Sequence, residues 1–213
     1  MRAVGRGRLI TIEGLDGAGK TTLAGALTRR LGAAGVTVAL LREPGGVEAS
    51  ERVRELVTDP ALELGPRAEA LLYAAARAQL VQERLVPLLE AGTSIVLDRF
   101  VDSSLAYQGA GRGLGVAAVR AINAFGTADL VADRTLLLRV STVTGRARLG
   151  GRGEAADRLE SEDEAFFATV AAAYDELAAG DPQRIRVIDA DRPAEGVLES
   201  AWGLVGDLFG VDR

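Results

Sequence analysis

Short apolar runs alternate with longer helical patterns along this chain. The apolar runs are residues 9–12, 36–41, 94–97, 135–140 and 185–188. Helical patterns separate them, for example at residues 68–89 and 166–179. Strands that alternate with helices predict a parallel sheet. Because the runs are apolar throughout rather than at every second position, we expect helices on both faces of that sheet, as in a doubly wound α/β fold.

Polar clusters follow the first three predicted strands directly. A glycine-rich loop follows the first strand, Arg42-Glu43-Pro44-Gly45-Gly46 the second and Asp98-Arg99-Phe100 the third. In an open parallel sheet, ligands bind at the carboxyl ends of the strands. We therefore expect the three clusters to meet at one rim of the sheet.

The glycine-rich loop fits GxxxxGKT, the pattern of a phosphate-binding loop (P-loop). Its glycines let the backbone wind tightly and turn N–H groups inward, Lys20 adds a cation, and Thr21 offers a hydroxyl to Mg²⁺ where a helix begins. The alternative is a glycine-rich turn without a ligand, and the strand before the loop and the helix after it, residues 22–31, argue against that. The predicted ATP-binding residues are Gly14, Leu15, Asp16, Gly17, Ala18, Gly19, Lys20, Thr21 and Thr22.

Composition narrows the chemistry further. The chain has 213 residues, enough for one domain with a real core, and a formal net charge of −5. This charge gives no general attraction to nucleic acid polymers or anionic membranes. With no cysteine and no histidine, disulfides, thiolate zinc sites and imidazole acid–base catalysis are excluded. No apolar stretch has the length of a signal-peptide core or a membrane span, so we expect a cytoplasmic protein without a membrane partner.

Residues 145–160 interrupt the alternation of strands and helices. They combine four arginines, Arg146, Arg148, Arg152 and Arg158, with several glycines. The composition leaves two interpretations open: a mobile basic flap, or an ordinary solvated loop between two helices.

Six motifs, taken in order, make the chain resemble the thymidylate kinase family. The motifs are Glu13 with the glycine loop, Arg42-Glu43-Pro44-Gly45-Gly46, Tyr73-Ala74-Ala75-Ala76-Arg77, Asp98-Arg99-Phe100, Ser103-Ser104-Leu105-Ala106-Tyr107-Gln108-Gly109 and Asp157-Arg158-Leu159-Glu160. The second and fourth motifs together are more specific than the P-loop, because shikimate, adenylate and gluconate kinases share the loop without this pair. The resemblance implies phosphorylation of dTMP to dTDP by ATP, which supplies dTTP synthesis.

The resemblance also implies an architecture. The expected fold is a three-layer P-loop kinase fold with a mainly five-stranded parallel sheet, forming one domain over residues 1–213. Residues 145–160 are then a mobile lid. Family membership further implies Mg²⁺ as cofactor and a homodimer formed through apolar faces of the helices around residues 68–89 and 116–125.

Roles for substrate-binding residues follow from the resemblance. It implies that Tyr73 stacks on thymine, that Arg77 hydrogen-bonds the base edge, and that Arg99 clamps the dTMP phosphate. The i, i+4 spacing supports the first pair, since it places both side chains on one helix face. Without the resemblance, the core interpretation of Tyr73, as an aromatic residue in an alanine- and leucine-rich helix, is favoured over stacking. The full predicted substrate-binding set is Asp16, Arg42, Pro44, Tyr73, Arg77, Asp98, Arg99, Ser104, Tyr107 and Gln108.

Three of those residues have narrower expected tasks. Ser104 is expected at the polar edge of thymine, although loop serines often only form turns. Tyr107 is expected to block the ribose 2′-position and so favour deoxynucleotides. Asp16 is expected near the sugar 3′-hydroxyl and the magnesium shell, with a solvated loop aspartate as the alternative.

The implied reaction needs cations rather than a base. A phosphate monoester has a second pKa of ~6, so dTMP is already mostly dianionic at neutral pH. Two anions must approach in line, and cations must stabilise the transferred group. The predicted catalytic residues are Lys20, Arg99, Arg152 and Arg158, with Thr21 and Asp16 as metal ligands. Within the lid, Arg152 and Arg158 come first as the catalytic arginine, Arg146 and Arg148 next, and Glu160 completes the motif.

The sequence also allows competing interpretations. The chain could be a monophosphate kinase with another base preference, such as dUMP, a nucleotide-dependent switch, or a family member that binds nucleotides without turnover. Tyr107, Ser104 and Arg77 favour dTMP, and a switch has no need of an acceptor-phosphate site. Arg139, near the end of a predicted strand, either approaches the phosphate site or reaches solvent along its aliphatic stem.

Overall fold

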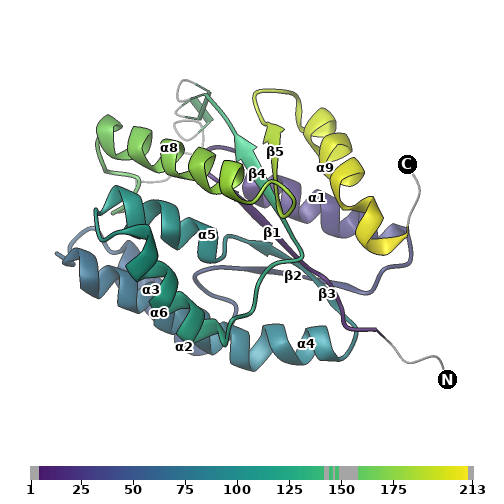
Figure 1. Cartoon of the computed structure of the whole chain (residues 1–213), viewed down its shortest axis with the longest axis horizontal. Coiled ribbons are helices and arrows are strands. Elements are labelled where there is room, and N and C mark those ends of the chain that lie inside the picture. Colours follow the sequence, from purple (N-terminus) through teal and green to yellow (C-terminus); the bar gives the residue numbers. More distant parts are fainter. Residues whose placement is uncertain (1–4, 142–143, 146, 149–157, 211–213) are drawn as a thin grey trace.

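Five parallel strands form the centre of the computed structural model, which describes residues 5–141, 144–145, 147–148 and 158–210. The strands are β1 (Leu9–Gly14), β2 (Val38–Arg42), β3 (Ser94–Asp98), β4 (Arg134–Arg139) and β5 (Ile185–Asp189). They lie in the order β2-β3-β1-β4-β5 (Figure 1). Each predicted apolar run contributes one of these strands, so the predicted sheet is confirmed.

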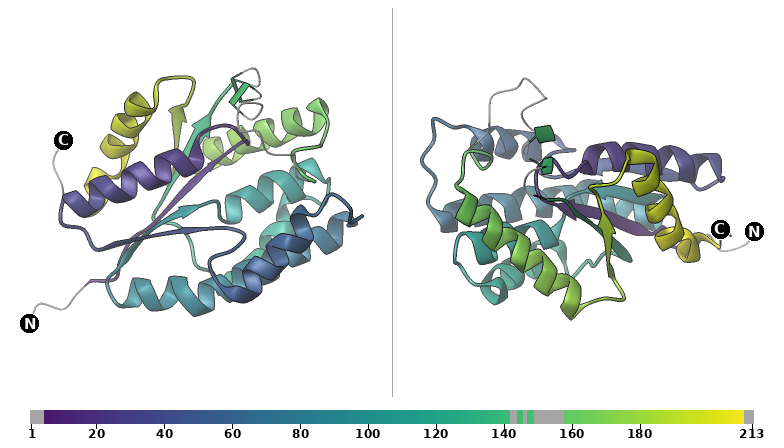
Figure 2. Two further views of the ribbon diagram at one scale, coloured as in Figure 1. Left: turned by 180° about the vertical axis from the view of Figure 1, so that it is seen from behind. Right: turned by 90° about the horizontal axis from the view of Figure 1, so that it is seen from above.

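Two helices, α1 (Lys20–Ala33) and α9 (Ala194–Phe209), cover one face of the sheet (Figure 2). Their buried side chains pack on Ile10 and Ile12 of β1, because alternate residues of a strand point to opposite faces. Arg30 of α1 lies over the ring of Trp202 of α9, with its guanidinium carbon 4.6 Å from the ring centre. This layer supports the helix that begins at the glycine loop.

The opposite face carries most of the remaining helices. They are α2 (Glu48–Thr58), α3 (Pro66–Leu80), α4 (Val86–Glu90), α5 (Val101–Ser104), α6 (Val116–Thr127) and α8 (Glu164–Gly180). Leu80, Leu85 and Leu89 from the α3–α4 region pack against the sheet, while α2 and α6 pack on α3. The three-layer α/β prediction is therefore confirmed.

The predicted helix over residues 68–89 is interrupted by a π-helical turn. Residues Val81–Leu85 form this turn between α3 and α4, although the helical path continues through it. Pro87 explains the change: proline has no backbone N–H to donate, and its ring crowds the carbonyl four residues earlier. A second π-helical segment, Leu105–Gly111, follows α5. Such turns are frequent at functional sites.

None of the helices in the described ranges is both long and apolar enough to cross a bilayer.

Candidate active site

A cavity of about 530 Å³ opens at the carboxyl ends of β1, β2 and β3. This is the rim at which the chain turns from one side of β1 to the other, where doubly wound folds bind ligands. The lining includes seventeen of the predicted site residues: Asp16, Gly17, Gly19, Lys20, Thr21, Thr22, Arg42, Pro44, Tyr73, Arg77, Asp98, Arg99, Ser104, Tyr107, Gln108, Arg148 and Glu160. The expected meeting of the three polar clusters is confirmed.

The glycine loop has the backbone that phosphate binding requires. Gly14, Gly17 and Gly19 all have positive φ angles, which side chains with a Cβ rarely adopt. At Gly17 a Cβ would also lie 2.3 Å from the carbonyl oxygen of Gly145. Only glycine fits there, because the loop passes directly over the segment that follows β4.

Lys20 is folded back on the loop. Its Nζ donates to the carbonyl oxygen of Leu15 at 2.9 Å and lies 3.6 Å from Asp16. Burial, reinforced by Arg99, lowers the pKa of Lys20 to about 8 against the opposing pull of Asp16. A nucleotide phosphate would add negative charge beside this buried ammonium and so favour its protonated form.

A hydroxyl and a carboxylate lie together at the start of α1. Thr21 Oγ1 donates to Asp98 Oδ2 at 2.6 Å, and Asp16 lines the same cavity. Hard oxygen donors of this kind suit Mg²⁺, which binds one or two carboxylates plus substrate phosphates rather than a complete protein cage. Within the described residues no group of three or more potential acidic, histidine or cysteine ligands occurs. The residues present therefore fit a Mg²⁺ ion that is shared with a nucleotide.

Arg99 lies at the centre of the cavity with an unusual backbone. Its φ of 69° is in the left-handed region. Nη1 donates to the carbonyl of Gly14 at 3.2 Å and to Ser103 Oγ at 3.0 Å, and Nη2 donates to Asp16 at 2.5 Å. The guanidinium also lies over the ring of Tyr107. These contacts fix one planar cation beside the glycine loop.

Asp16 is held as a carboxylate by its neighbours. Burial alone raises its pKa, but Arg99 and Lys20 outweigh that effect, so the pKa lies well below its usual range. Tyr107 donates its hydroxyl to the second oxygen of Asp16 at 3.1 Å. Asp16 and Tyr107, which were predicted separately, are thus in direct contact, and a solvated loop aspartate is the wrong description of Asp16.

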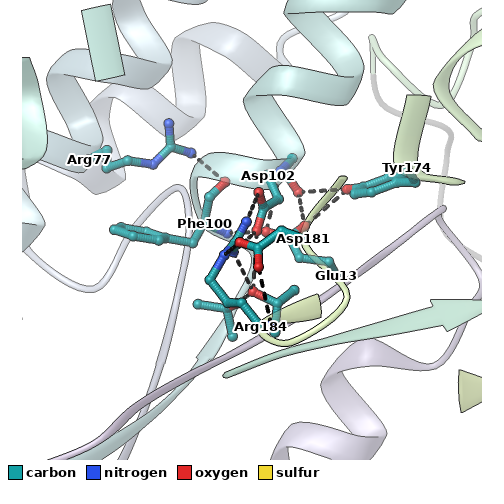
Figure 3. Close-up of polar contacts among 10 residues, drawn as sticks. Glu13, Arg77, Phe100, Asp102, Tyr174, Asp181 and Arg184 are labelled. Atoms are coloured by element: carbon teal, nitrogen blue, oxygen red, sulfur yellow. Dashed lines mark hydrogen bonds and ion pairs between the residues drawn. The ribbon is translucent and has the colours of Figure 1, made fainter. Parts of the chain in front are cut away.

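Arg77 is almost fully buried, with 2% of its surface exposed. Nε donates to Glu43 Oε2 at 2.7 Å, Nη1 to Ser104 Oγ at 2.9 Å and to Asn123 Oδ1, and Nη2 to the carbonyl of Phe100 at 3.0 Å. The bond to Phe100 is visible in Figure 3. A guanidinium has five N–H groups, so these contacts leave one Nη2 hydrogen for another acceptor.

Glu43 balances the charge of Arg77, although burial disfavours its own ionised form. Burial raises the pKa of Glu43 to about 7, although Arg77 lowers it. Its second oxygen, Oε1, has no hydrogen-bond partner within the described part of the chain. Tyr73, one turn before Arg77 on α3, lines the same cavity.

Several lining residues escaped prediction. Arg54 and Thr58 come from α2, and Arg54 Nη1 donates to the carbonyl of Pro44 at 3.2 Å. Their i, i+4 spacing on an amphipathic helix was a usable signal. Glu43 and Ser103 belong to two of the six family motifs, but no role was predicted for either residue. Asn123 binds Arg77 without lining the cavity. It carried no local signal, since only the tertiary fold brings α6 to Arg77.

Arg42 lines the cavity, but its guanidinium is engaged elsewhere. Nη1 donates to the carbonyl of Pro44 at 2.9 Å, and Nη2 donates to both carboxylate oxygens of Glu51 at 3.0 Å. The side chain is 47% exposed. Arg42 therefore braces the turn after β2 against α2.

The predicted lid arginines that the structure describes have different surroundings. Arg148 lines the cavity and donates to the carbonyl of Ala190 at 3.0 Å. Arg158 is not among the lining residues: its Nε donates to the carbonyl of Val57 at 3.0 Å, and its Nη2 pairs with buried Glu69 at 2.7 Å. Arg146 and Arg152 lie outside the described residues.

The side chain of Arg139 reaches solvent, which was one of its two predicted positions. Its side chain is 57% exposed and pairs with Asp175 of α8 at the surface. The alternative, in which Arg139 approaches the phosphate site, is wrong.

The remaining residues of the glycine loop support its shape. Gly14 packs against Leu138, Leu15 joins the apolar cluster around α8, and Ala18 is buried against the α1 face. Ala18 also lines a second cavity of about 220 Å³, together with Gly19, Arg148, Arg192 and Val197. This smaller, mostly apolar cavity lies beside the loop on the α9 side.

Comparisons with known proteins agree with this geometry. The family model described as thymidylate kinase matches residues 12–201. A thymidylate kinase of Deinococcus radiodurans is 47% identical over 95% of this chain and 98% of its own length. Those of Thermomicrobium roseum and Halorhodospira halophila are 46% and 44% identical, over 94% and 97% of this chain and 95% and 97% of their own lengths. The match extends over nearly the whole of each relative, and the chain belongs to the thymidylate kinase family.

Proposed function

We propose that this protein transfers the γ-phosphoryl group of ATP to dTMP, giving ADP and dTDP. The observation that carries the proposal is the single cavity that joins a phosphate-binding loop to two fixed guanidinium groups, Arg77 and Arg99. A nucleotide-dependent switch has no use for the second half of that cavity.

The acceptor is proposed to lie between α3 and the π-helical segment Leu105–Gly111. The remaining Nη2 hydrogen of Arg77 suits the O4 carbonyl of thymine, with Tyr73 against the base plane and Ser104 and Gln108 at its edge. Gln108 is oriented by donating to Glu69 at 2.8 Å. Tyr107 is proposed to occupy the space that a ribose 2′-hydroxyl would need.

Arg99 and Arg54 are proposed to receive the acceptor phosphate. Planar guanidinium groups bind phosphate oxygens bidentately. The dTMP phosphate needs no base, because it is mostly dianionic at neutral pH. These cations therefore lower the repulsion between two anions as they approach in line.

ATP is proposed to bind with its phosphates on the glycine loop and its base in the cavity beside Ala18 and Val197. Lys20 then pairs with the donor phosphates. Thr21 and Asp16, with Asp98 adjacent, are the residues proposed to hold Mg²⁺, which neutralises charge on the phosphate oxygens when bound.

The domain is proposed to be a single unit, residues 1–213, with residues 145–160 as its lid. An arginine from a closing segment can raise the rate about 10³-fold or more. Because Arg158 is bound by Glu69, Arg152 is the first candidate for this role. Alanine at Arg152 should abolish most turnover, with little change in dTMP affinity. Alanine at Arg158 should act through stability, and full activity in both variants would contradict a lid arginine.

A homodimer is supported by the exposed apolar surface. Phe125 of α6 is 91% exposed and Leu71 of α3 is 57% exposed, and these two helices pack together. We propose a cytoplasmic homodimer joined through this surface. Sedimentation of the wild type and of Phe125→Asp tests it, since the variant should sediment as a monomer.

The reaction is tested by ADP release. Purified protein with ATP and Mg²⁺ is compared with dTMP, dUMP, dCMP, AMP and no acceptor. Strong stimulation by dTMP above the others is expected. Equal stimulation by dUMP would shift the base preference, and slow turnover indifferent to every monophosphate would favour a switch.

A further inference from the structure

Glu13 stands in a sequence motif but has no role in the site described so far. It occupies β1 directly before Gly14, is fully buried, and is absent from the described lining of the cavity. We propose that Glu13 is a positioning residue for Arg99, fixing both the backbone and the side chain of the cation that receives the acceptor phosphate. The inference rests on the proposed role of Arg99 in dTMP binding.

The backbone of Arg99 is held from β1. Its left-handed conformation is unfavourable for a residue with a Cβ, so neighbouring contacts must maintain it. The N–H of Arg99 donates to the carbonyl of Ile12 at 3.0 Å. The next amide, that of Phe100, donates to Glu13 Oε1 at 2.8 Å, and the amide of Ser103 reaches the same oxygen at 3.3 Å. One carboxylate oxygen therefore closes the turn that contains Arg99.

The side chain of Arg99 is held through one hydroxyl. Ser103 Oγ donates to Glu13 Oε2 at 2.5 Å and accepts from Arg99 Nη1 at 3.0 Å. Tyr174 of α8 donates to the same Oε2 atom at 3.0 Å, as Figure 3 shows. Glu13 therefore fixes Ser103, and Ser103 fixes one edge of the guanidinium.

Other contacts also hold the segment that follows Arg99. The carbonyl of Phe100 accepts from Arg77, and Asp102 pairs with Arg184 at 2.6 Å (Figure 3). Residues 99–104 are thus bound to α3, to β1 and to Arg184, which directly precedes β5. Glu13 differs from these other anchors because its contacts lead directly to Arg99.

A buried carboxyl group needs a reason to be there. Burial raises the pKa of Glu13, and Asp102 adds to the rise, against the hydrogen bond from Ser103 and the charge of Arg99. An apolar residue would avoid this desolvation cost. The contacts of Glu13 with both the turn and Ser103 are consistent with a task at the phosphate end of the cavity.

The test separates phosphate binding from general stability. Affinities for dTMP and for thymidine, which lacks the phosphate, are measured by calorimetry for the wild type and for Glu13→Leu and Glu13→Gln. Glu13→Leu removes every acceptor, so dTMP binding should weaken by about 10- to 100-fold while thymidine binding changes less than about two-fold. Glu13→Gln keeps an acceptor for the amides and should recover part of the loss. Leu31→Ala, a cavity variant at the far end of α1, is the stability control and should affect neither ligand selectively.

A double-variant cycle identifies the route. If Glu13 acts through Arg99, Glu13→Leu combined with Arg99→Lys should bind dTMP no more weakly than Arg99→Lys alone. Additive losses, or equal weakening of dTMP and thymidine, would overturn the inference. Wild-type dTMP affinity in Arg99→Lys would overturn the phosphate role of Arg99 and this inference together, whereas a loss there without one in Glu13→Leu overturns this inference only.

Should Glu13→Leu fail to fold, Ser103→Ala carries the same test. It removes the hydroxyl between Glu13 and Arg99, and it should weaken dTMP binding but not thymidine binding. Unchanged dTMP affinity in that variant would contradict the proposed route.

Discussion

The two ends of the cavity hold their arginines in opposite ways. At the end between α3 and α6, Arg77 is buried and gives four of its N–H groups to Glu43, Ser104, Asn123 and Phe100. At the rim where β2 ends, Arg42 is half exposed and paired with Glu51.

The difference lies in how freely each guanidinium group can rearrange. A buried guanidinium with one remaining N–H can bind a ligand only through an acceptor placed at that hydrogen, because its other N–H groups are already bonded. An exposed guanidinium adapts to its ligand and is screened by solvent. Substitutions at the two ends should therefore differ in both kind and size.

Removing each arginine gives the largest contrast. Arg77→Met leaves Glu43 buried without its partner, so the free energy of unfolding should fall by about 3–5 kcal/mol. Arg42→Met breaks an exposed pair and should cost about 1 kcal/mol or less. Urea denaturation of both variants measures the difference, and equal losses would break the comparison.

Glu43 and Glu51 should give opposite pH dependences. The pKa of Glu43 is about 7 in the folded protein against an ordinary value of 4.5, so the folded state retains a proton that the unfolded chain releases. Stability from this group is full below pH 4.5 and is lost as the pH rises through 7, by up to about 3 kcal/mol. Glu43→Gln removes this titration, so its stability relative to the wild type should rise over that range.

Glu51 is the matched control. The hydrogen bond from the Gly46 amide and the charge of Arg42 lower its pKa despite slight burial. Its contribution is present above the ordinary pKa and is lost as the pH falls, so Glu51→Gln should show the reverse slope. Thermal melts from about pH 3 to pH 8 measure both slopes, since Glu43 titrates above pH 4.5 and Glu51 below it. Parallel curves would refute the assignment.

A substitution at Arg54, on the same rim, should affect substrate binding rather than stability. Arg54→Ala should raise the KM for dTMP by roughly 10- to 100-fold, because a charged hydrogen bond contributes about 1.5–3 kcal/mol. Arg52→Ala, on the same helix but paired with Glu48 in solvent, should leave KM unchanged. Similar kinetics in the two variants would remove Arg54 from the site.

Arg139 should give the smallest effect. Its exposed pair with Asp175 predicts a change in stability within about 0.5 kcal/mol and no change in turnover for Arg139→Ala. A clear loss of activity would mean that Arg139 reaches the phosphates after all.

Local patterns predicted the elements and the loop, but not the pairs between them. The five strands and the glycine loop follow from runs of adjacent residues, which is why they were found. The partners of Arg77 lie 23 to 46 positions away, and no spacing rule links α3 to Asn123 on α6. Charge alone also could not separate Arg158 from Arg148, since Glu69 becomes its partner only in the folded chain.

The π-helical turn was missed for a different reason. Pro87 was present within the predicted helix and signals an interruption. The periodicity of the surrounding apolar residues concealed it, because the helical path continues beyond the turn.

Tryptophan and tyrosine lie on opposite faces of the sheet, so each face has its own spectroscopic probe. The single tryptophan, Trp202, lies beside Arg30 in the layer of α1 and α9. All three tyrosines lie across the sheet, two lining the cavity and Tyr174 bound to Glu13. Emission from tryptophan therefore reports the layer of α1 and α9 and tyrosine absorbance the opposite layer, so an unlabelled protein can reveal whether the two layers melt together.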